Sequence, residues 1–541
     1  MTLFYSKEKQ AFSSLSSWLF LFSGIFTGIL FVASRTTIAV IISIVLSSLL
    51  SVYIFLIKKV QNMLLTEMNK KVFIFSLVAT LFADIQFYKA FSSDLGGLIK
   101  MLGLNGESTG VTVLSIMVSL LLVLFSSIVI CAFFYLTYTK LLSLFAKIYK
   151  TFDKKDKVTF LAIFGVFATF IIVSYSLTFV FWGTSQSYDV IYTSDTGVLF
   201  STNCWLNIRD LENDLRQPLF GLVSAPFSVI PYAISTVLFF IPNLYAFLFA
   251  ISQAAILILS LFLIVKLMNL GAEKILVYCI FISSFPSILF ALNLEQYIFA
   301  LFFLVLFVYA NKLKVGNQEE LFLASTGSLL TSAALFPLLY KRNLSVKKNA
   351  LYFVNLALVF VSLCFIFGRG PYFIDIISKI QELLSFSGQG LSLFDRLKQY
   401  TVFICSCFVF PSTQIVENSI QQTAANSFNL FGIFIFVVAT VSFFLNRKDS
   451  FAKISFAWIC FSFVMLGVVG WGAKENGMVL YSLYFGWAFV SLLVLLVNKI
   501  PKKLITIKYV IYSAALLVLL FFNIQGIVEI LKFGITYFKM V

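Results

Sequence analysis

The 541-residue chain is 60% hydrophobic, only 11% of its residues are charged, and phenylalanine alone occurs 66 times. This composition excludes a soluble protein, because many apolar runs reach the roughly 20 residues that a helix needs to cross a bilayer. The net charge of +16 comes from short lysine and arginine clusters between those runs, as in the cytoplasmic loops of membrane proteins. We therefore expect an all-α polytopic membrane protein that binds membrane lipid and no nucleic acid.

The first third of the chain has a consistent predicted topology with a cytoplasmic N-terminus. We expect helices at about 16–34, 37–57, 72–88, 110–137 and 158–181. Lysine clusters at 58–71 and 140–157 mark the cytoplasmic side. The helix at 158–181 therefore leaves the cytoplasm and places the following polar loop, about 182–217, outside.

The middle of the chain contains apolar runs that are separated by very short turns. They lie near 218–241, 244–266, 273–290, 294–311 and 320–340. Basic residues at 341–348 indicate a return to the cytoplasm, so an odd number of crossings is required. Five full crossings meet that requirement, and so do three crossings with re-entrant segments.

The last third begins with a helix at 349–368 that leaves the cytoplasm, followed by a second outside segment, about 369–427. Further helices are expected at about 428–446, 453–471 and 478–497, and a last helix ends near 524. The tail after it is expected at the membrane interface. In total we expect about 13–15 transmembrane helices. They divide into a four-helix N-terminal addition at 1–157, a membrane core at 158–498 and a C-terminal helix with its interfacial tail at 499–541.

The polar loop after the fifth helix is the strongest candidate for a reaction site. The segment SYDVIYTSDTGVLFSTNCWLNIRDLENDLRQPLFGL holds five of the 23 acidic residues of the chain. They are Asp189, Asp195, Asp210, Glu212 and Asp214. A solvated loop would also explain these carboxylates. The aromatic and apolar residues between them, and the apolar run that begins directly at Pro218, indicate instead a loop held at the membrane surface.

Several segments follow this loop in a recognisable order. The motif Asp-x-Arg-x-Pro-Leu-Phe at 214–220 leads into the next helix, and LEQYIFALFFLVLFVY (294–309), ASTGSLLTSAALFP (324–337) and GAKENGMVLYSLYFGW (472–487) come later. Together with the basic loop and the exit helix before it, this arrangement resembles the GT-C class of integral-membrane glycosyltransferases. The resemblance covers about 158–498. It departs from the family where Gln217 stands before Pro218 in place of an expected histidine.

The resemblance implies a membrane enzyme that moves a sugar from a polyprenyl-phosphate donor to a cell-envelope acceptor. The acceptor would be a polysaccharide, a teichoic acid or a lipid on the extracytoplasmic face of the cytoplasmic membrane. Such a transfer needs a general base for the acceptor hydroxyl and cations for the phosphate leaving group. Because the chain contains no histidine, an aspartate or glutamate is the natural base. A single displacement would invert the anomeric centre.

The resemblance makes the first acidic residues after the exit helix the catalytic candidates. Asp195, within SDTG, is the first choice as base and Asp189 is the second. A turn aspartate is the alternative for Asp195. Asp214 is expected to position the loop through an ion pair with Arg216. No cofactor is evident from the sequence, and a divalent metal shared by the two catalytic candidates would be the only metal site.

Outside cations and two glutamates complete the candidate site. The candidates for binding the donor phosphate are Arg369, Arg396 and Lys474. Glu295 lies between two apolar runs, and since ionisable residues are costly in hydrocarbon, we expect it at a helix end beside a polar cavity. Helix capping is the alternative role for Glu295. Glu475 follows Lys474 on a short outside turn.

Three other functions stay open at the level of sequence. A transporter or flippase for a lipid-linked saccharide would need charged residues within its helices, whereas nearly all charges here lie in loops. A polysaccharide polymerase or ligase would place the chemistry in the outside segment 369–427, through its arginines. The third is a non-catalytic scaffold or sensor.

Overall fold

A computed structural model describes residues 69–101, 109–183, 190–206, 216–366, 380–381, 384–474 and 476–540. The helices expected at 16–34 and 37–57 lie outside these residues. The chain forms two compact units that alternate along the sequence. Unit 1 comprises Met1–Thr151, Cys204–Leu238 and Glu319–Lys379. Unit 2 comprises Phe152–Asn203, Phe239–Gln318 and Ile380–Val541. The N-terminal segment thus shares a unit with two later segments that the sequence assigns to the membrane core.

Unit 1 is helical in its described part. Its elements are α4 (Lys70–Met101), α5 (Thr109–Thr151), α8 (Phe220–Val237), α13 (Gln318–Ser328), the 3-10 helix η3 (Leu330–Leu339) and α14 (Val346–Ile366). The Tyr138 hydroxyl of α5 donates to the Pro226 carbonyl of α8 at 2.9 Å. The Glu319 carboxylate of α13 accepts from Lys341 at 3.2 Å and from the Tyr352 hydroxyl of α14 at 2.9 Å. Charged and hydroxyl groups therefore join helices that are otherwise largely apolar.

Unit 2 contains most of the described helices and one small hairpin. Its elements are α6 (Lys154–Leu177), α7 (Thr196–Thr202), α9 (Leu244–Leu267), α10 (Lys274–Ser283), α11 (Phe285–Leu292), α12 (Tyr297–Leu313), α17 (Leu393–Ser406), β1 (Thr413–Val416), β2 (Ser419–Gln422), α18 (Leu430–Leu445), α19 (Ser450–Ser462), the π-helix η4 (Phe463–Val468), the 3-10 helices η5 (Gly477–Tyr481) and η6 (Lys502–Leu504), α20 (Ser482–Val497) and α21 (Ile505–Tyr537). The hairpin departs from the all-α expectation. Glu417 and Asn418 turn it with φ of 46° and 65°, as a two-residue hairpin loop requires.

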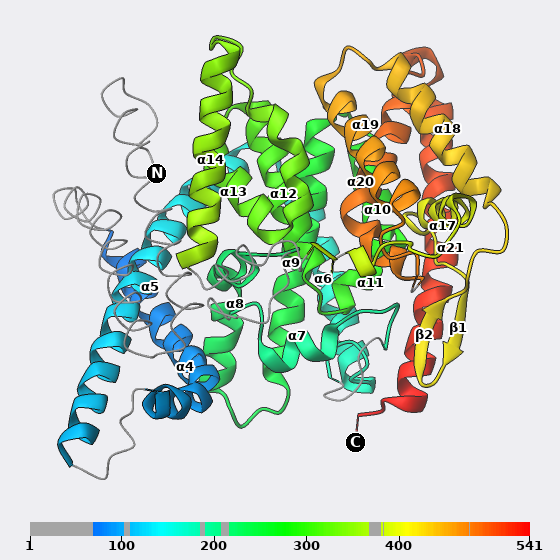
Figure 1. Cartoon of the computed structure of the whole chain (residues 1–541). Coiled ribbons are helices and arrows are strands. Elements are labelled where there is room, and N and C mark those ends of the chain that lie inside the picture. Colours follow the sequence, from blue (N-terminus) through cyan, green and yellow to red (C-terminus); the bar gives the residue numbers. More distant parts are fainter. Residues whose placement is uncertain are drawn as a thin grey trace. The chain divides into compact units, whose positions relative to one another are not determined.

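The described residues include six helices that are long and apolar enough to cross a membrane. They are α6, α8, α9, α19 with η4, η5 with α20, and α21 (Figure 1). The pair α10 and α11, bent by 61° at Ser284, counts as a seventh if it is one span. The chain is therefore a mostly helical, multi-pass membrane protein, as the composition predicts.

The helices of unit 2 alternate in direction, so their termini gather at two opposite ends. We call one the basic end, which comprises 153–157, 266–274, 312–314, 446–453 and 498–508. There Lys312 of α12 donates to the carbonyl of Leu267, the last residue of α9, at 2.6 Å and lies 5.2 Å from the ring centre of Phe451 in α19. We call the other the Asp195 end, which comprises 190–203, 293–297, 384–429 and 469–481. In this arrangement α9, the bent pair α10–α11 and α12 follow one another in alternating directions.

The expected end of the last helix near 524 is wrong, because α21 runs unbroken to Tyr537. Its second half is held by tertiary contacts that hydropathy does not reveal. The Asn523 amide donates to the carbonyls of Ser283 and Phe408 at 2.8 Å each. Near the C-terminus, the Thr178 hydroxyl donates to the Phe538 carbonyl at 2.7 Å. Residues 525–537 are thus part of a packed helix.

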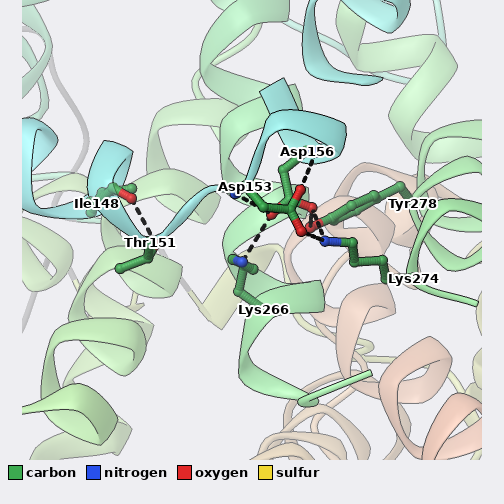
Figure 2. Close-up of polar contacts among 7 residues, drawn as sticks. All are labelled: Ile148, Thr151, Asp153, Asp156, Lys266, Lys274 and Tyr278. Atoms are coloured by element: carbon green, nitrogen blue, oxygen red, sulfur yellow. Dashed lines mark hydrogen bonds and ion pairs between the residues drawn. The ribbon is translucent and has the colours of Figure 1, made fainter. Parts of the chain in front are cut away.

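A fully buried carboxylate joins three helices at the basic end. Asp156, in the first turn of α6, is 0% exposed and lies 2.9 Å from Lys266 Nζ of α9 and 2.7 Å from Lys274 Nζ of α10 (Figure 2). The Tyr278 hydroxyl donates to it at 3.2 Å. Asp153 caps α6 in a capping box with Asp156. The hydrogen bond from Lys274 holds the pKa of Asp153 at about 2.

A second ion pair extends this network to the C-terminal helices. Lys508 of α21 lies 2.5 Å from the Glu273 carboxylate before α10 and also donates to the Asn498 side chain after α20. Both Lys508 and Glu273 are nearly fully buried. The basic end is therefore a connected set of charges that ties five helices together.

We expect Asp156→Asn to destabilise the protein by about 3–5 kcal/mol, because it breaks a buried ion-pair network, leaving Lys266 without its counter-charge and Lys274 with Asp153 alone. The matched control is Asp153→Asn, which keeps a good helix N-cap and removes only a surface ion pair. Thermal unfolding of the purified protein in detergent would measure both. Equal midpoints for the two variants would contradict the structural role of Asp156.

Candidate functional site

The loop that carries Asp195 is built by an unusual backbone and a β-bridge. Tyr192 and Thr193 have φ of 52° and 61°, a left-handed conformation that is strained for residues other than glycine. The backbone of Ile420 in β2 exchanges two hydrogen bonds of 2.8 Å with Val190 and Tyr192. Asp195 then occupies the N-cap of α7, yet its side chain makes no capping hydrogen bond. The carboxylate is exposed at the surface of the Asp195 end.

A set of buried polar side chains lies next to this loop. The Thr196 hydroxyl donates to the Asn293 side-chain oxygen at 3.2 Å, which connects α7 to the break between α11 and α12. The Gln253 amide, from the middle of α9, donates to the carbonyls of Phe290 and Asn293 at 3.0 and 2.9 Å. Among the described residues, Asn293 Nδ2 and Gln253 Oε1 are buried without a hydrogen-bond partner. Since such atoms are costly, they indicate a polar interior beside Asp195.

Glu295 belongs to the same break in the chain. It lies two residues after Asn293 and two before the start of α12, and it is only 3% exposed. One of its carboxylate oxygens accepts from the backbone of Gln296 at 3.1 Å. The sequence places this residue at a helix end, and that is where the structure has it. A carboxylate buried at a break between two helices is placed as a functional group is, rather than as a surface charge.

Three tyrosines extend the polar interior towards α20. The Tyr297 ring at the start of α12 lies 5.8 Å from the rings of both Tyr481 and Tyr484. The Trp471 indole donates to the Tyr481 hydroxyl at 2.8 Å. Aromatic faces with polar edges therefore connect the Glu295 segment with the turn that carries Lys474.

The turn with Lys474 contacts the Asp195 loop through glycine. Gly470 and Gly472 have φ of 75° and 74°, which glycine adopts without strain. A Cβ at Gly477 would lie 2.6 Å from the Thr193 hydroxyl oxygen, so the two segments touch directly. Lys474 is exposed on this turn.

Arg396 lies on α17 at the same end, and its side chain makes contacts that stabilise the fold. Its guanidinium donates to the Val468 carbonyl at 3.0 Å, and its stem packs on Gly388 and Gly470. The neighbouring Gln399 side chain donates to Asn476 at 3.4 Å. Arg396, predicted to bind the donor phosphate, therefore also holds the segment 384–399 against the Lys474 turn.

The structure thus brings four predicted site residues to one end of unit 2, namely Asp195, Glu295, Arg396 and Lys474. Arg216 belongs to unit 1, where its carbonyl accepts from Leu330 at 2.7 Å. Asp189, Asp214, Arg369 and Glu475 lie outside the described residues, so the ion pair between Asp214 and Arg216 stays a prediction. Over the described ranges, no group of three His, Cys, Asp or Glu side chains could hold a metal ion.

The neutral members of the site do not stand out in the sequence. These members carry no charge and belong to no sequence motif that indicates a site; they are Asn293, Gln253 and Thr196. A signal was present at Gln253, because a lone amide in the middle of the apolar 24-residue helix α9 must find partners inside the bundle.

The contact between the two loops predicts a specific double-mutant result. Gly477→Ala is expected to destabilise the protein by about 1–3 kcal/mol, because the new methyl group overlaps Thr193. Thr193→Ala in the same chain should recover most of that loss. The control is Gly165→Ala, where nothing lies within 4 Å of the added carbon. If the loss at Gly477 is the same with and without Thr193, the loops do not touch.

Comparison with known proteins adds no relative. No protein-family model, no curated protein and no solved structure matches the chain. The likeness to GT-C glycosyltransferases therefore rests on the segments quoted above from the sequence.

Proposed function

We propose that the protein is a membrane glycosyltransferase that moves a sugar from a polyprenyl-phosphate donor to a cell-envelope acceptor on the extracytoplasmic face. The observation that carries this proposal is the gathering of Asp195, buried Glu295 and Lys474 at one end of unit 2, where Asn293 and Gln253 each have one buried amide atom without a hydrogen-bond partner. The lysine-rich basic end lies at the opposite termini of the same helices. By the positive-inside rule it faces the cytoplasm, so the Asp195 end faces outward.

The proposed reaction is a single displacement at the anomeric carbon. The acceptor hydroxyl forms the new C–O bond while the bond from that carbon to the phosphate oxygen breaks. The hydroxyl proton passes to a carboxylate, and polyprenyl phosphate leaves with the electron pair. Asp195 is the proposed base, because its carboxylate is exposed and does not cap its helix.

The surrounding groups suit the two parts of the donor. Sugar hydroxyls both donate and accept hydrogen bonds, which matches the open amide atoms of Asn293 and Gln253. The flat rings of Tyr297, Tyr481 and Tyr484 suit the apolar face of a pyranose. Lys474 is the proposed point charge for the phosphate, and Glu295 orients the buried polar groups.

Substitution of Asp195 or Glu295 is expected to lower the rate of sugar transfer, whereas substitution of Asp395 at the same end is not. Asp195→Asn should lower the transfer rate by about 10²–10⁴-fold, the usual contribution of a general base, without a change in the unfolding midpoint. Glu295→Gln should also lower the rate. The matched control is Asp395→Asn, an exposed aspartate on α17 paired with Lys398. The measurement is transfer of label from a panel of polyprenyl-phosphate hexoses and pentoses to envelope material in proteoliposomes.

A normal rate in Asp195→Asn, with expression unchanged, would remove the proposed base. Absence of transfer by the native protein from every donor in the panel, together with movement of the lipid-linked saccharide across the bilayer, would instead support a flippase.

The proposed binding of the donor phosphate by Lys474 leads to a separate prediction. Lys474→Ala should raise KM for the donor by at least tenfold and leave the unfolding midpoint unchanged, because the charge-assisted bond to phosphate contributes about 1.5–3 kcal/mol. Lys474→Arg should recover much of the affinity. An unchanged KM in the alanine variant would place the donor phosphate elsewhere.

A further inference from the structure

A cavity of about 530 Å³ opens at the basic end, away from the proposed reaction site. It lies between the first turn of α6 and the turn that leads into α10. Its lining includes Asp153, Lys154, Lys155 and Lys274, together with the apolar side chains of Leu270 and Ile275. A lining that combines cations with apolar groups is typical of a site for an amphipathic anion.

The charges of this cavity do not cancel. Lys274 is paired with both Asp153 and Asp156, and Lys266 adds a second cation to Asp156, so two lysines already match the two carboxylates (Figure 2). Lys154 and Lys155 are exposed, and among the described residues neither has a hydrogen-bond or ion-pair partner. Two positive charges are thus left to face a ligand at the rim of the helix bundle.

An apolar stripe leads from this cavity along the outside of α6. Val158 is 58% exposed and Leu161 is 66% exposed, and they follow Lys154 at spacings of four and seven residues on the same helix face. Gly165 continues the stripe, and nothing lies within 4 Å of the position of its missing Cβ. The stripe therefore has room for an extended hydrocarbon chain beginning directly below the lysines.

We propose that this lysine cavity binds the phosphate of an anionic phospholipid, with one acyl chain lying along the Val158, Leu161 and Gly165 stripe of α6. The phosphate bonds to Lys154 and Lys155 at the level of the lipid headgroups, where polybasic segments meet anionic membranes. The ion pairs of Lys274 keep the carboxylate of Asp153 from repelling it. The site is independent of the sugar-transfer proposal, since it lies at the opposite helix ends.

The test compares lipid-dependent stability in two double variants. The native protein in nanodiscs with phosphatidylglycerol should unfold several degrees higher than in phosphatidylcholine alone. The variant Lys154→Ala with Lys155→Ala should lose that increment. The control variant, Arg447→Ala with Lys448→Ala, removes two exposed cations from the same end outside the cavity and should keep it. Equal increments in both variants would overturn the proposal.

Two further arms separate the possible outcomes. Inorganic phosphate, added to phosphatidylcholine nanodiscs at matched ionic strength, should give no increment, and an increment equal to that of the lipid would mean a site for a soluble anion. A photoreactive phosphatidylglycerol with its label in the acyl chain should crosslink within 158–166 of the native protein. Crosslinks absent from α6 would overturn the proposal even if the variants fail to fold.

Discussion

The structure of unit 2 depends on the buried carboxylate of Asp156. A charge that is removed from water needs counter-charges in close contact, and here these come from Lys266 of α9 and Lys274 of α10. A slide of one helix by a single turn, about 5.4 Å, would break the network. The axial register of α6, α9 and α10 is therefore set at the basic end. Because these helices are rigid, the same register places Thr196 beside Asn293 at the Asp195 end.

Much of the helical order follows from hydropathy, and what fails does so for identifiable reasons. The run predicted at 244–266 is the helix Leu244–Leu267. Hydropathy does not predict that α21 continues to Tyr537, because Asn523 and the glycines after it are polar or small in sequence but packed in the fold. The positions of the lysines predict which side of the membrane a loop faces, but they do not predict which carboxylate each lysine pairs with. In the sequence Asp156 is therefore only one acidic residue within a basic cluster, and its role as a buried ion-pair partner is not apparent.

The candidate site was predictable only where it is charged. Asp195, Glu295 and Lys474 stand out because charges are rare in this chain. Their convergence is not visible in the sequence, since it depends on the turn of Tyr192 and Thr193 and on the approach of Gly477 to that turn. The amides of Asn293 and Gln253 are found only when burial and missing partners are known. The charged groups of the site can thus be predicted from the sequence, whereas its neutral groups become apparent only in the fold.

The two ends of unit 2 differ in their polar groups, and this difference suits a bundle that is stabilised at one end and carries the proposed reaction site at the other. At the basic end each buried carboxylate is matched by lysines, which makes those charges structural. At the Asp195 end the buried Glu295 lies in one segment with Asn293 and Tyr297, and the backbone is strained at Tyr192 and Thr193. Strain of this kind persists only where the surrounding structure enforces it. At this turn the hydrogen bonds with Ile420 and the approach of Gly477 to Thr193 provide that enforcement, while the ion pairs at the other end set the register of the helices that carry the turn.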